Sequence, residues 1–329
     1  MNLQDLNKWL AERNLKGHWD HQPWSQVVRS YLWKWIDIYE GLNWSGKLIT
    51  TDEAGRRTIQ LRNPGLPAGM TNTIHFSVQL VNPGEIAAAH RHTAAAIRFI
   101  LKGNPKAYTV VEGERLPMSE GDLLTTPNWT WHDHVNGGDE PVMWLDGLDI
   151  RLVGTFGAMI QENFKKSQQP IEKPESYSAK VFGQARPTWI KSEFGAPPYR
   201  YPWTETYANL MALKESAADP FDGVLLEYSN PLTGGPTLQT FSCQIQLLRP
   251  HEKTKSHRHT STTVYHAFRG RGMTKVSANE MNWDKGDIFV VPPWQFHSHE
   301  NPTGEDAILF SITDKPSTEA LGLYREEAE

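Results

Sequence analysis

Cysteine is almost absent from this sequence. The single residue, Cys243, cannot form a disulfide within the chain, and it excludes a zinc or iron–sulfur site built from several thiolates. Long apolar runs are also missing, because no stretch approaches the roughly 20 residues that cross a bilayer. The N-terminus, MNLQDLNKWLAERN, lacks both the basic start and the apolar core of a signal peptide. The sequence therefore predicts a soluble cytoplasmic protein with no membrane partner.

An excess of positive charge is missing as well. The chain has 33 Lys and Arg against 38 Asp and Glu, a formal charge of −5, and no run of like charges, which argues against a nucleic-acid partner. The length of 329 residues favours two domains. Thirteen histidines remain as the candidate metal ligands, and the 13 Trp and 22 Pro suit an all-β-dominated protein better than a helical bundle.

The chain contains a long internal repeat. The tripeptide HRH at residues 90–92 recurs at residues 257–259, and the offset of 167 also holds for the glycine that closes the following apolar run. Downstream, GDLLTTPNWTWHDHVN at residues 121–136 matches GDIFVVPPWQFHSHEN at residues 286–301, with a uniform offset of 165. Matched residue types at a fixed long offset indicate duplication of a whole domain.

Each copy has the pattern of β-strands. TIHFSVQL at residues 73–80 alternates polar and apolar side chains, and TFSCQIQL at residues 240–247 has the same alternation. Short strands separated by turns such as NPG and NGG favour a small antiparallel barrel or jelly roll in each copy. Helical periodicity lies outside the copies, and we expect helices over residues 3–10, 24–39 and 204–215.

The expected domain organisation follows from the repeat. Lys- and Pro-rich sequence from 167 to 198 has the composition of an inter-domain linker. We expect four segments: an N-terminal helical, Trp-rich segment (1–60), a catalytic barrel (61–166), a linker with a helix (167–220) and a second barrel (221–329).

The histidines have the spacing of metal ligands. His90 and His92 point the same way from an extended strand, and the hairpin that ends in His132 supplies a third imidazole. Three neutral imidazoles leave positions open for substrate and O2, which suits Fe(II), Mn(II) or a catalytic zinc. The alternative is that these are exposed polar strand residues, but the matched second copy argues against it. That copy offers a possible second metal site at His257, His259 and His297.

These blocks resemble the paired motifs of the cupin superfamily, and the chain resembles a bicupin with two tandem jelly-roll-like barrels. Two departures narrow the resemblance. The glutamate that many cupins carry after His-x-His falls on Ala96 and Thr263, and Trp129 and Trp294 occupy the motif's second glycine. A three-histidine site without a carboxylate resembles the gentisate 1,2-dioxygenase family, which includes salicylate and 1-hydroxy-2-naphthoate dioxygenases. The segments NPGLPAGMTNT, HRHTAAAIRFILKG, WLDGLDI and FSITDKPSTEALGLYREE carry the resemblance further.

The resemblance implies an enzyme that uses Fe(II) and O2. Such an enzyme opens a small aromatic acid of the salicylate type between the carboxyl-bearing carbon and the adjacent hydroxyl-bearing carbon, and both oxygen atoms enter the product. It also implies a homo-oligomer, a tetramer in this family. Alternatives from other classes are a metal-dependent isomerase or decarboxylase and a non-catalytic binding protein, although the latter commonly loses the histidines that are complete here.

The first copy carries polar groups that the second lacks. Arg98 is a candidate for a forked pair with the substrate carboxylate, whereas its counterpart is Tyr265. Asp146 is expected to orient His134, an acid/base candidate for the ring hydroxyl, whereas the counterpart of Asp146 is Ser311. We therefore expect the second triad to be competent for metal but catalytically silent.

Further substrate contacts are expected at Gln79, Arg56 and Arg57, the two arginines reaching either the carboxylate or the ring substituents. Each candidate has a structural alternative. Arg98 could form a surface salt bridge, and His134 could be a solvated loop residue. The arginine pair could lie in an exposed charged turn, and Gln79 could be a hydrogen-bonding residue of the barrel wall.

Position 75 departs from the family pattern. Gentisate dioxygenases generally have tryptophan four residues before the glutamine, and this chain has His75. Replacing a flat, bulky wall with a smaller hydrogen-bonding group favours a salicylate with another 5-substituent over gentisate itself. His75 as an additional metal ligand is the alternative, although it lies outside the motif.

Overall fold

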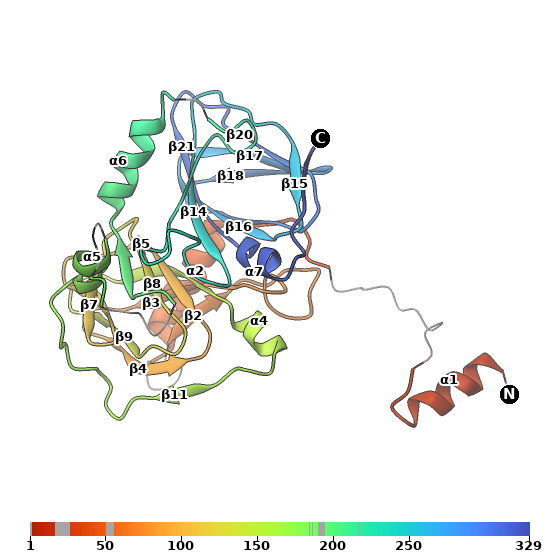
Figure 1. Cartoon of the computed structure of the whole chain (residues 1–329), viewed down its shortest axis with the longest axis horizontal. Coiled ribbons are helices and arrows are strands. Elements are labelled where there is room, and N and C mark those ends of the chain that lie inside the picture. The colour runs from red at the N-terminus through yellow and green to blue at the C-terminus, as the bar shows by residue number, and fades with distance from the viewer. Residues whose placement is uncertain are drawn as a thin grey trace.

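A computed structural model of the chain describes residues 2–16, 27–50, 56–183, 185, 187–189, 195–216 and 218–329. Two β-barrels lie against each other (Figure 1) and confirm the expected all-β-dominated, two-barrel fold. Each barrel is built from one six-stranded and one five-stranded antiparallel sheet.

The first barrel pairs its strands in the orders β12-β8-β5-β10-β3-β2 and β11-β4-β9-β6-β7. It includes β2, which the sequence placed in the N-terminal segment, and β12, which it placed in the linker. The strand bounds are β2 (Arg57–Gln60), β3 (His75–Val81), β4 (Ile86–His92), β5 (Ala96–Lys102), β6 (Ala107–Val111), β7 (Glu114–Pro117), β8 (Leu123–Thr126), β9 (His132–Asn136), β10 (Val142–Leu148), β11 (Gln161–Asn163) and β12 (Tyr199–Tyr201).

The second barrel has the matching orders β1-β19-β16-β21-β14-β13 and β18-β17-β20-β15-β22. Its register reproduces that of the first barrel. Asp146 of β10 lies between Ser77 and Arg98, and Ser311 of β21 lies between Gln244 and Tyr265. The offsets of 167 and 165 therefore align equivalent positions in space. The strand bounds are β1 (Tyr31–Trp33), β13 (Val224–Glu227), β14 (Ser242–Leu248), β15 (His257–His259), β16 (Thr263–Arg269), β17 (Arg271–Val276), β18 (Asn279–Asp284), β19 (Ile288–Val291), β20 (His297–Glu300), β21 (Ala307–Thr313) and β22 (Glu326–Ala328).

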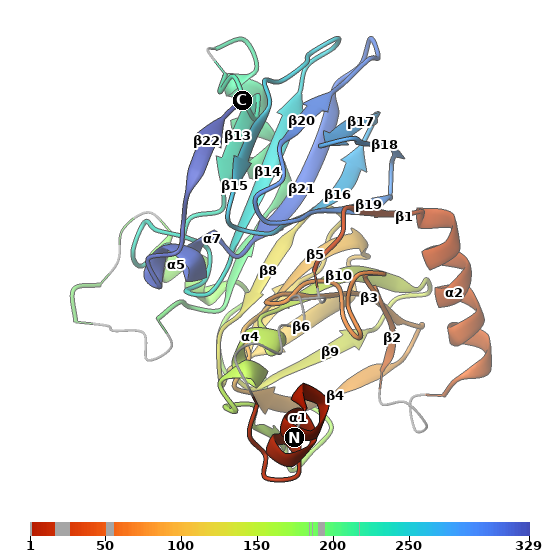
Figure 2. The same ribbon diagram turned by 90° about the vertical axis from the view of Figure 1, so that its right-hand side faces the viewer.

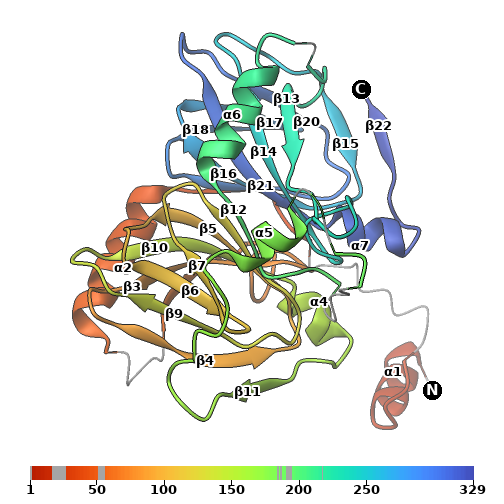
Figure 3. The ribbon, with the colours of Figure 1, turned by 60° about the vertical axis from the view of Figure 1, so that its left-hand side comes forward.

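A short strand before each barrel adds to the sheet of the other barrel. In Figure 2, β1 runs along β19 of the second barrel, and in Figure 3, β12 lies against the first barrel, where it pairs with β8. A helix follows each strand: α2 (Trp35–Leu48) follows β1, and α6 (Trp203–Leu213) follows β12. The first N–H of α2 donates to Asp287 of the second barrel, and the first N–H of α6 donates to Asp122 of the first barrel. We call these two strand–helix segments, β1 with α2 and β12 with α6, the crossed straps. They belong to the duplication, although the sequence repeat did not reveal them.

The expected helices are confirmed in part. Helix α1 (Leu3–Ala11) begins with a capping box, and α6 covers most of the third expected helix. The helix expected over 24–39 is wrong at residues 27–34, where β1 lies, and confirmed at residues 35–39, where α2 begins. Residues 24–26 lie outside the described part. In the described part of the chain, three short helices were not expected: α4 (Ile150–Thr155), α5 (Tyr177–Phe182) and α7 (Lys315–Ala320). Within the described residues, no helix is long and apolar enough to cross a membrane.

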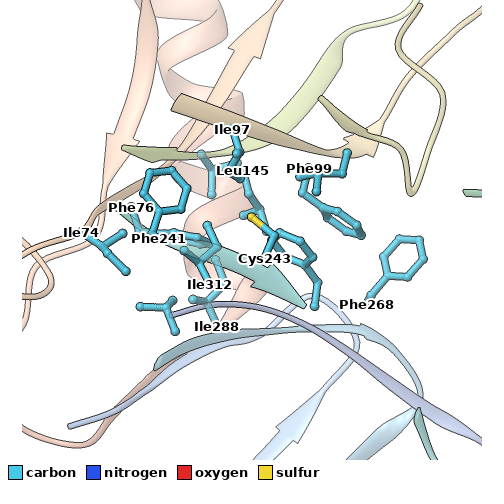
Figure 4. Packing of buried hydrophobic residues seen from close by; sticks show 14 of the residues in the cluster. Ile74, Phe76, Ile97, Phe99, Leu145, Phe241, Cys243, Phe268, Ile288 and Ile312 are labelled. Atoms are coloured by element: carbon cyan, nitrogen blue, oxygen red, sulfur yellow. The ribbon is translucent and has the colours of Figure 1, made fainter. Parts of the chain in front are cut away.

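The main hydrophobic core lies between the barrels. The apolar face of β3, with Phe76, packs with Ile97 and Phe99 of β5 against side chains of the second barrel, including Cys243 and Ile312 (Figure 4). The opposite, polar face of β3 points into the first barrel, as the strict alternation predicts. The shared core therefore holds the barrels together. A smaller apolar cluster in each barrel, with Trp144 in the first and Trp283 in the second, packs separately from it.

Two reciprocal hydrogen bonds join the barrels at their edges. Thr240 of the second barrel donates to Asp149 of the first at 2.7 Å, and Thr73 of the first donates to Asp314 of the second. Both aspartates also accept a backbone N–H from their own barrel. Thr240 is the counterpart of Thr73 in the repeat, and Asp314 is the counterpart of Asp149, so the two bonds are equivalent.

Candidate active site

Neighbouring strands bring the three histidines of the first copy together. His90 and His92 lie on β4, and His132 opens β9 directly opposite His90. Strand β4 has a register shift between Ala87 and His90, and such a bulge changes the direction of the side chains after it. The ligand atoms of the triad lie within 4.8 Å of one another, and all three side chains are buried. The predicted first triad is therefore formed.

Backbone carbonyls fix the tautomer of each imidazole. Nδ1 of His90 donates to Ala88 O at 3.0 Å, and Nδ1 of His92 donates to Ala94 O at 2.8 Å. Nδ1 of His132 likewise donates to a backbone carbonyl, that of Thr130, at 2.9 Å. Because a carbonyl only accepts, the proton sits on Nδ1 and the lone pair on Nε2. All three Nε2 atoms therefore have the state that binds a metal.

Burial keeps the triad neutral. It lowers the pKa of His90 to about 2 and that of His92 to about 4, and it lowers the pKa of His132 well below its ordinary value. Nε2 of His132 has no hydrogen-bond partner among the described residues. A buried nitrogen with a free lone pair needs a ligand, and three such imidazoles fit a divalent metal.

The arginine of HRH braces the hairpin that carries the third ligand. Arg91 lies over the rings of Trp129 and Trp131, 4.2 and 4.5 Å from their centroids, and pairs with Glu162 of β11. Trp129 has φ of 61°, the left-handed region that the motif's glycine normally fills. The stacked guanidinium holds the indole there, which accounts for the tryptophan at this position.

Arg98 lies beside the triad and is fully buried, so the alternative of a surface salt bridge is wrong. Its Nε lies 3.6 Å from Oδ1 of Asp146, and one NH group donates to Thr126. Arg98 Nε and Asp146 Oδ1 have no hydrogen-bond partner within the part of the chain that the structure describes. The guanidinium keeps unused donors, as a site for an anion requires.

His134 is buried, and its expected partner is wrong. Nδ1 lies 2.8 Å from Thr109 Oγ1 on the neighbouring strand β6, whereas Asp146 pairs with Arg98. Thr109 faces His134 directly across the β6–β9 ladder, so it is the side chain within reach. Burial, with help from Arg98 and Arg56, lowers the pKa of His134 well below its usual value. Its Nε2 has no hydrogen-bond partner among the described residues.

The two adjacent arginines have different surroundings. Arg56 reaches the triad, because its guanidinium contacts both ring nitrogens of His90. Burial lowers the pKa of Arg56 to about 10. Arg57 does not reach the triad: it is buried, donates to Ile49 O at 2.6 Å and forms a two-pronged pair with Glu85. The expected substrate contact of Arg57 and its alternative in an exposed turn are both wrong.

Gln79 is buried on the polar face of β3, and neither Nε2 nor Oε1 has a hydrogen-bond partner among the residues described. A wall residue that only stabilises the barrel would have partners, so this amide is better explained by a ligand. His75 opens the same strand and is not part of the triad group. Its pKa is lowered, first by burial and then by Arg151, while Asp146 opposes the shift. His75 therefore lies near Asp146, at one end of the site.

The second triad is formed with nearly the same geometry. The ring centroids of His257 and His297 are 4.3 Å apart, against 4.2 Å for His90 and His132. Nδ1 of His259 and of His297 donates to a backbone carbonyl, but Nδ1 of His257 has no hydrogen-bond partner in the described parts of the chain. The ligand set is therefore complete, while its orientation is less firmly fixed.

Sequence reasoning missed Thr109 and Thr126, the partners of His134 and Arg98. The repeat carried a signal for Thr109, since it matches Thr274, which lies 2.9 Å from His299 in the second barrel, but none for Thr126, which matches Val291. It was not recognised because threonine is common in strands and carries no metal-ligand spacing.

Comparisons with known proteins agree with this geometry. The Cupin domain family matches residues 77–148 and 244–313. A 5-aminosalicylate 1,2-dioxygenase from a Comamonas species is 46% identical over 99% of this chain and 90% of its own length. A gentisate 1,2-dioxygenase from a Haloferax species is 38% identical over 98% of this chain and 95% of its own. The crystal structure of salicylate 1,2-dioxygenase from Pseudaminobacter salicylatoxidans superposes with a TM-score of 0.90 at 30% identity, covering 99% of this chain and 97% of that one.

Proposed function

Because this chain belongs to the gentisate and salicylate 1,2-dioxygenase family of bicupins, we propose that its first barrel opens a 5-substituted salicylate with Fe(II) and O2. The chain is a ring-cleaving dioxygenase, and the substrate and the identity of the metal are the proposal. The proposed bond broken joins the carboxyl-bearing carbon to the adjacent hydroxyl-bearing carbon.

One observation carries the proposal: several buried polar atoms without partners surround a neutral histidine triad. They belong to Gln79, Arg98, His134 and Asp146, in the described part of the chain. Buried polar groups in folded proteins are normally satisfied, so this cluster fits a bound ligand that is itself polar and anionic. A salicylate has both properties, with its carboxylate and ortho hydroxyl.

The residues fit the metal as three neutral imidazoles whose Nδ1 atoms donate to backbone carbonyls, at His90, His92 and His132, so that each Nε2 carries the lone pair. Iron bound there would let electron density pass from the bound substrate to O2, which does not otherwise react directly with an aromatic ring. Open positions beside three histidines suit a substrate that chelates through two oxygens.

Each protein group has a proposed task. Arg98 binds the substrate carboxylate through its unused donors, and Asp146 holds that guanidinium in place. Arg56 adds a second cation beside the carboxylate or the phenolate. His134 accepts the proton of the ring hydroxyl at Nε2, and Thr109 fixes its orientation. Gln79 hydrogen-bonds the bound acid.

His75 is proposed to select the 5-substituent. It shares the polar face of β3 with Gln79, and a neutral imidazole can donate or accept one hydrogen bond. An amino or hydroxyl group suits such a partner. Since a 46% identical relative is named for 5-aminosalicylate, we propose that substrate first and gentisate second, with 1-hydroxy-2-naphthoate as the alternative.

An oxygen-electrode screen of the Fe(II)-loaded protein tests the proposal. The acids are 5-aminosalicylate, gentisate, salicylate and 1-hydroxy-2-naphthoate, and we expect the fastest O2 uptake with 5-aminosalicylate. His75→Trp should shift the ratio of gentisate to 5-aminosalicylate turnover, with Arg57→Lys as a control that leaves the ratio unchanged. No O2 uptake with any of the acids would refute the function, and an unchanged ratio in His75→Trp would remove His75 from the ring.

We also propose a cytoplasmic homo-oligomer, a tetramer by resemblance to the family. Exposed apolar side chains support assembly, among them Leu3 and Trp9 of α1 and Ile36 and Trp44 of α2. Light scattering on the purified protein measures the mass, and a monomer would contradict this expectation.

A further inference from the structure

The charges that face the two triads have opposite signs. In the first barrel, Arg56 and Arg98 lower the pKa of His90 and of His92, after burial, and Asp146 acts in the opposite direction on His92. Two cations and one anion therefore surround the first triad. This balance attracts an anionic ligand.

In the second barrel the balance is reversed. Tyr265 replaces the arginine, and the carboxylates of Asp219 and Glu326 act on His257 and oppose the effect of burial on its pKa. Asp222 acts in turn on Tyr265. Lys315 is the cation that affects His259. Two carboxylates and one lysine therefore act on the histidines of the second triad, and a third carboxylate acts on Tyr265.

Strand pairing accounts for the position of Glu326. On the β15–β22 ladder it lies opposite His259, and Glu327 lies opposite Arg258 and pairs with it. Directly opposed residues share a face of the sheet, so Glu326 is on the histidine face and Glu327 on the other. In the first barrel, Gln161 lies opposite the matching histidine. A neutral amide thus stands where the second barrel has a carboxylate, and Figure 2 shows β22 running along β15.

The other two carboxylates come from the turn before β13. Oδ1 of Asp219 accepts the N–H groups of Phe221 and Asp222, which fixes the turn. The Phe221 ring lies 5.3 Å from that of His257, edge to face. The carbonyl of Asp222 accepts Nε2 of Gln246 at 2.7 Å, and Gln246 is the counterpart of Gln79. The turn therefore lies against the second triad.

These carboxylates repel one another. The pKa of Asp222 is raised to about 7, first by burial and then by the charges of Asp219 and Glu326. Two buried imidazole nitrogens of the same barrel, Nε2 of His297 and of His299, have no hydrogen-bond partner within the described residues. Lone pairs without partners beside excess negative charge match a cation.

We propose that the second barrel binds a divalent cation whose charge is balanced by Asp219, Asp222 and Glu326, that this cation fastens β22 to β15, and that the same carboxylates keep aromatic acids out. The proposal rests on the second triad binding metal, as expected above. The first barrel leaves the metal charge to be balanced by the substrate, whereas the second balances it with the protein.

Glu326→Gln tests the counter-charge, because it copies the amide of the first barrel. The matched control is Glu327→Gln, one residue along the same strand on the opposite face. Both are made in a His90→Ala/His92→Ala background, so that metal binding reports the second triad. Mn²⁺ titration followed by electron paramagnetic resonance should give one ion per chain. Removing a charged neighbour of a metal site costs roughly 10-fold in affinity or more, and we expect about 10-fold for Glu326→Gln and no change for Glu327→Gln.

Digestion of the C-terminus tests the fastening. A serine carboxypeptidase, which needs no metal, is applied with and without Mn²⁺, and release of the last residues is followed by mass spectrometry. Saturating Mn²⁺ should slow release roughly threefold or more, because strand opening then competes with metal binding. In Glu326→Gln, Mn²⁺ should slow release of the last residues much less. In Glu327→Gln, Mn²⁺ should slow release as much as in the parent protein.

Salicylate binding tests the exclusion. The Mn²⁺-loaded background protein should bind no salicylate by calorimetry at concentrations that saturate the wild type. Three outcomes would each overturn the proposal. The two glutamate variants could bind Mn²⁺ with equal affinity, the rate of digestion could be the same with and without Mn²⁺, or salicylate could bind to the second barrel. Failure of the wild type to consume O2 would instead count against the proposed function and would leave these measurements unaffected.

Discussion

The two barrels share a scaffold and differ in the charges that it displays. Both have a three-histidine group of nearly equal geometry, but Arg98 corresponds to Tyr265 and Gln161 to Glu326. The ligands of a metal thus survived duplication while the groups around them diverged. We infer from this difference that the imidazoles decide whether a metal binds, and that the surrounding charges decide which ligand the metal accepts.

Features common to both barrels identify the structural part of the site. The Thr–His pairs on β6–β9 and β17–β20 match, as do the arginines stacked between aromatic rings, Arg91 in the first barrel and Arg258 in the second. A feature present in both barrels cannot by itself explain activity in one. His134 is therefore the residue for which the comparison most needs an experiment.

Loss of the triads should give the largest difference between the barrels. We expect His92→Ala to abolish O2 uptake, because it removes a ligand of the proposed catalytic metal. His257→Ala/His259→Ala should lose metal from the second barrel and keep near-normal kcat. Metal content per chain and O2 uptake are measured together. Abolished turnover in a folded double variant that retains its first metal would show that the second barrel takes part in the chemistry.

Matched histidine variants should separate catalysis from structure. His134→Gln and His299→Gln both disrupt a buried bond to threonine, so we expect similar losses of thermal stability. Only His134→Gln should lower kcat, by roughly 10²- to 10⁴-fold, if the ring accepts the hydroxyl proton. Melting curves and steady-state kinetics check both effects. Equal kcat in the two variants would assign His134 a purely structural role.

The arginine position should give the next largest effect. A charge-assisted hydrogen bond is worth roughly 1.5–3 kcal/mol, so Arg98→Ala should lower kcat/KM about 10- to 150-fold. Arg98→Lys keeps the charge but loses the forked geometry, so its kcat/KM should lie between that of the wild type and that of Arg98→Ala. Tyr265→Phe is the control in the second barrel and should leave kcat/KM unchanged. Wild-type kcat/KM in Arg98→Ala would remove the arginine from the substrate.

The ligands could be predicted from the sequence, and most of their partners could not. The spacing of His90 and His92 defines a shared face, and the repeat supplies the rest. The expected bond between Asp146 and His134 failed because it depends on which strands are neighbours. Asp146 faces Arg98 across β10–β5, and His134 faces Thr109 across β9–β6, and no local pattern specifies either pairing.

The crossed straps were missed for a similar reason. The segments that begin at Tyr31 and Tyr199 match in few residues, and their short strands complete a sheet of the other barrel. Their conformation is set by that distant sheet edge, so periodicity within the segment predicted a helix over 24–39. Arg57 was misjudged for another reason. Its place next to Arg56 in the sequence suggested a shared role, but its guanidinium donates to Ile49 O and pairs with Glu85, just before β4.

The smallest expected effect concerns Asp149 and Asp314, the two aspartates that join the barrels, and it should be the same in both barrels. Burial is the main cause that raises the pKa of Asp149 and of Asp314 to about 6, from an ordinary value of 3.8. Between these values the folded protein binds protons that the unfolded chain does not, so this contribution stabilises the fold at low pH and is lost as the pH rises through 6. Near its steepest, each group changes the free energy of unfolding by about 1.4 kcal/mol per pH unit.

Replacement by the neutral amide should remove that contribution equally from both barrels. Asp149→Asn and Asp314→Asn keep the shape of the side chain and its contact with Thr240 or Thr73. Urea unfolding at pH 5 and pH 7 gives the free energy of unfolding, and the variant-minus-wild-type difference cancels the histidines, which titrate in both proteins. We expect this difference to change by about 1 kcal/mol between the two pH values, and by the same amount at both positions, because the two bonds join counterpart residues of the repeat. Unequal changes would show that the barrels diverged at their junction as well as in their interiors.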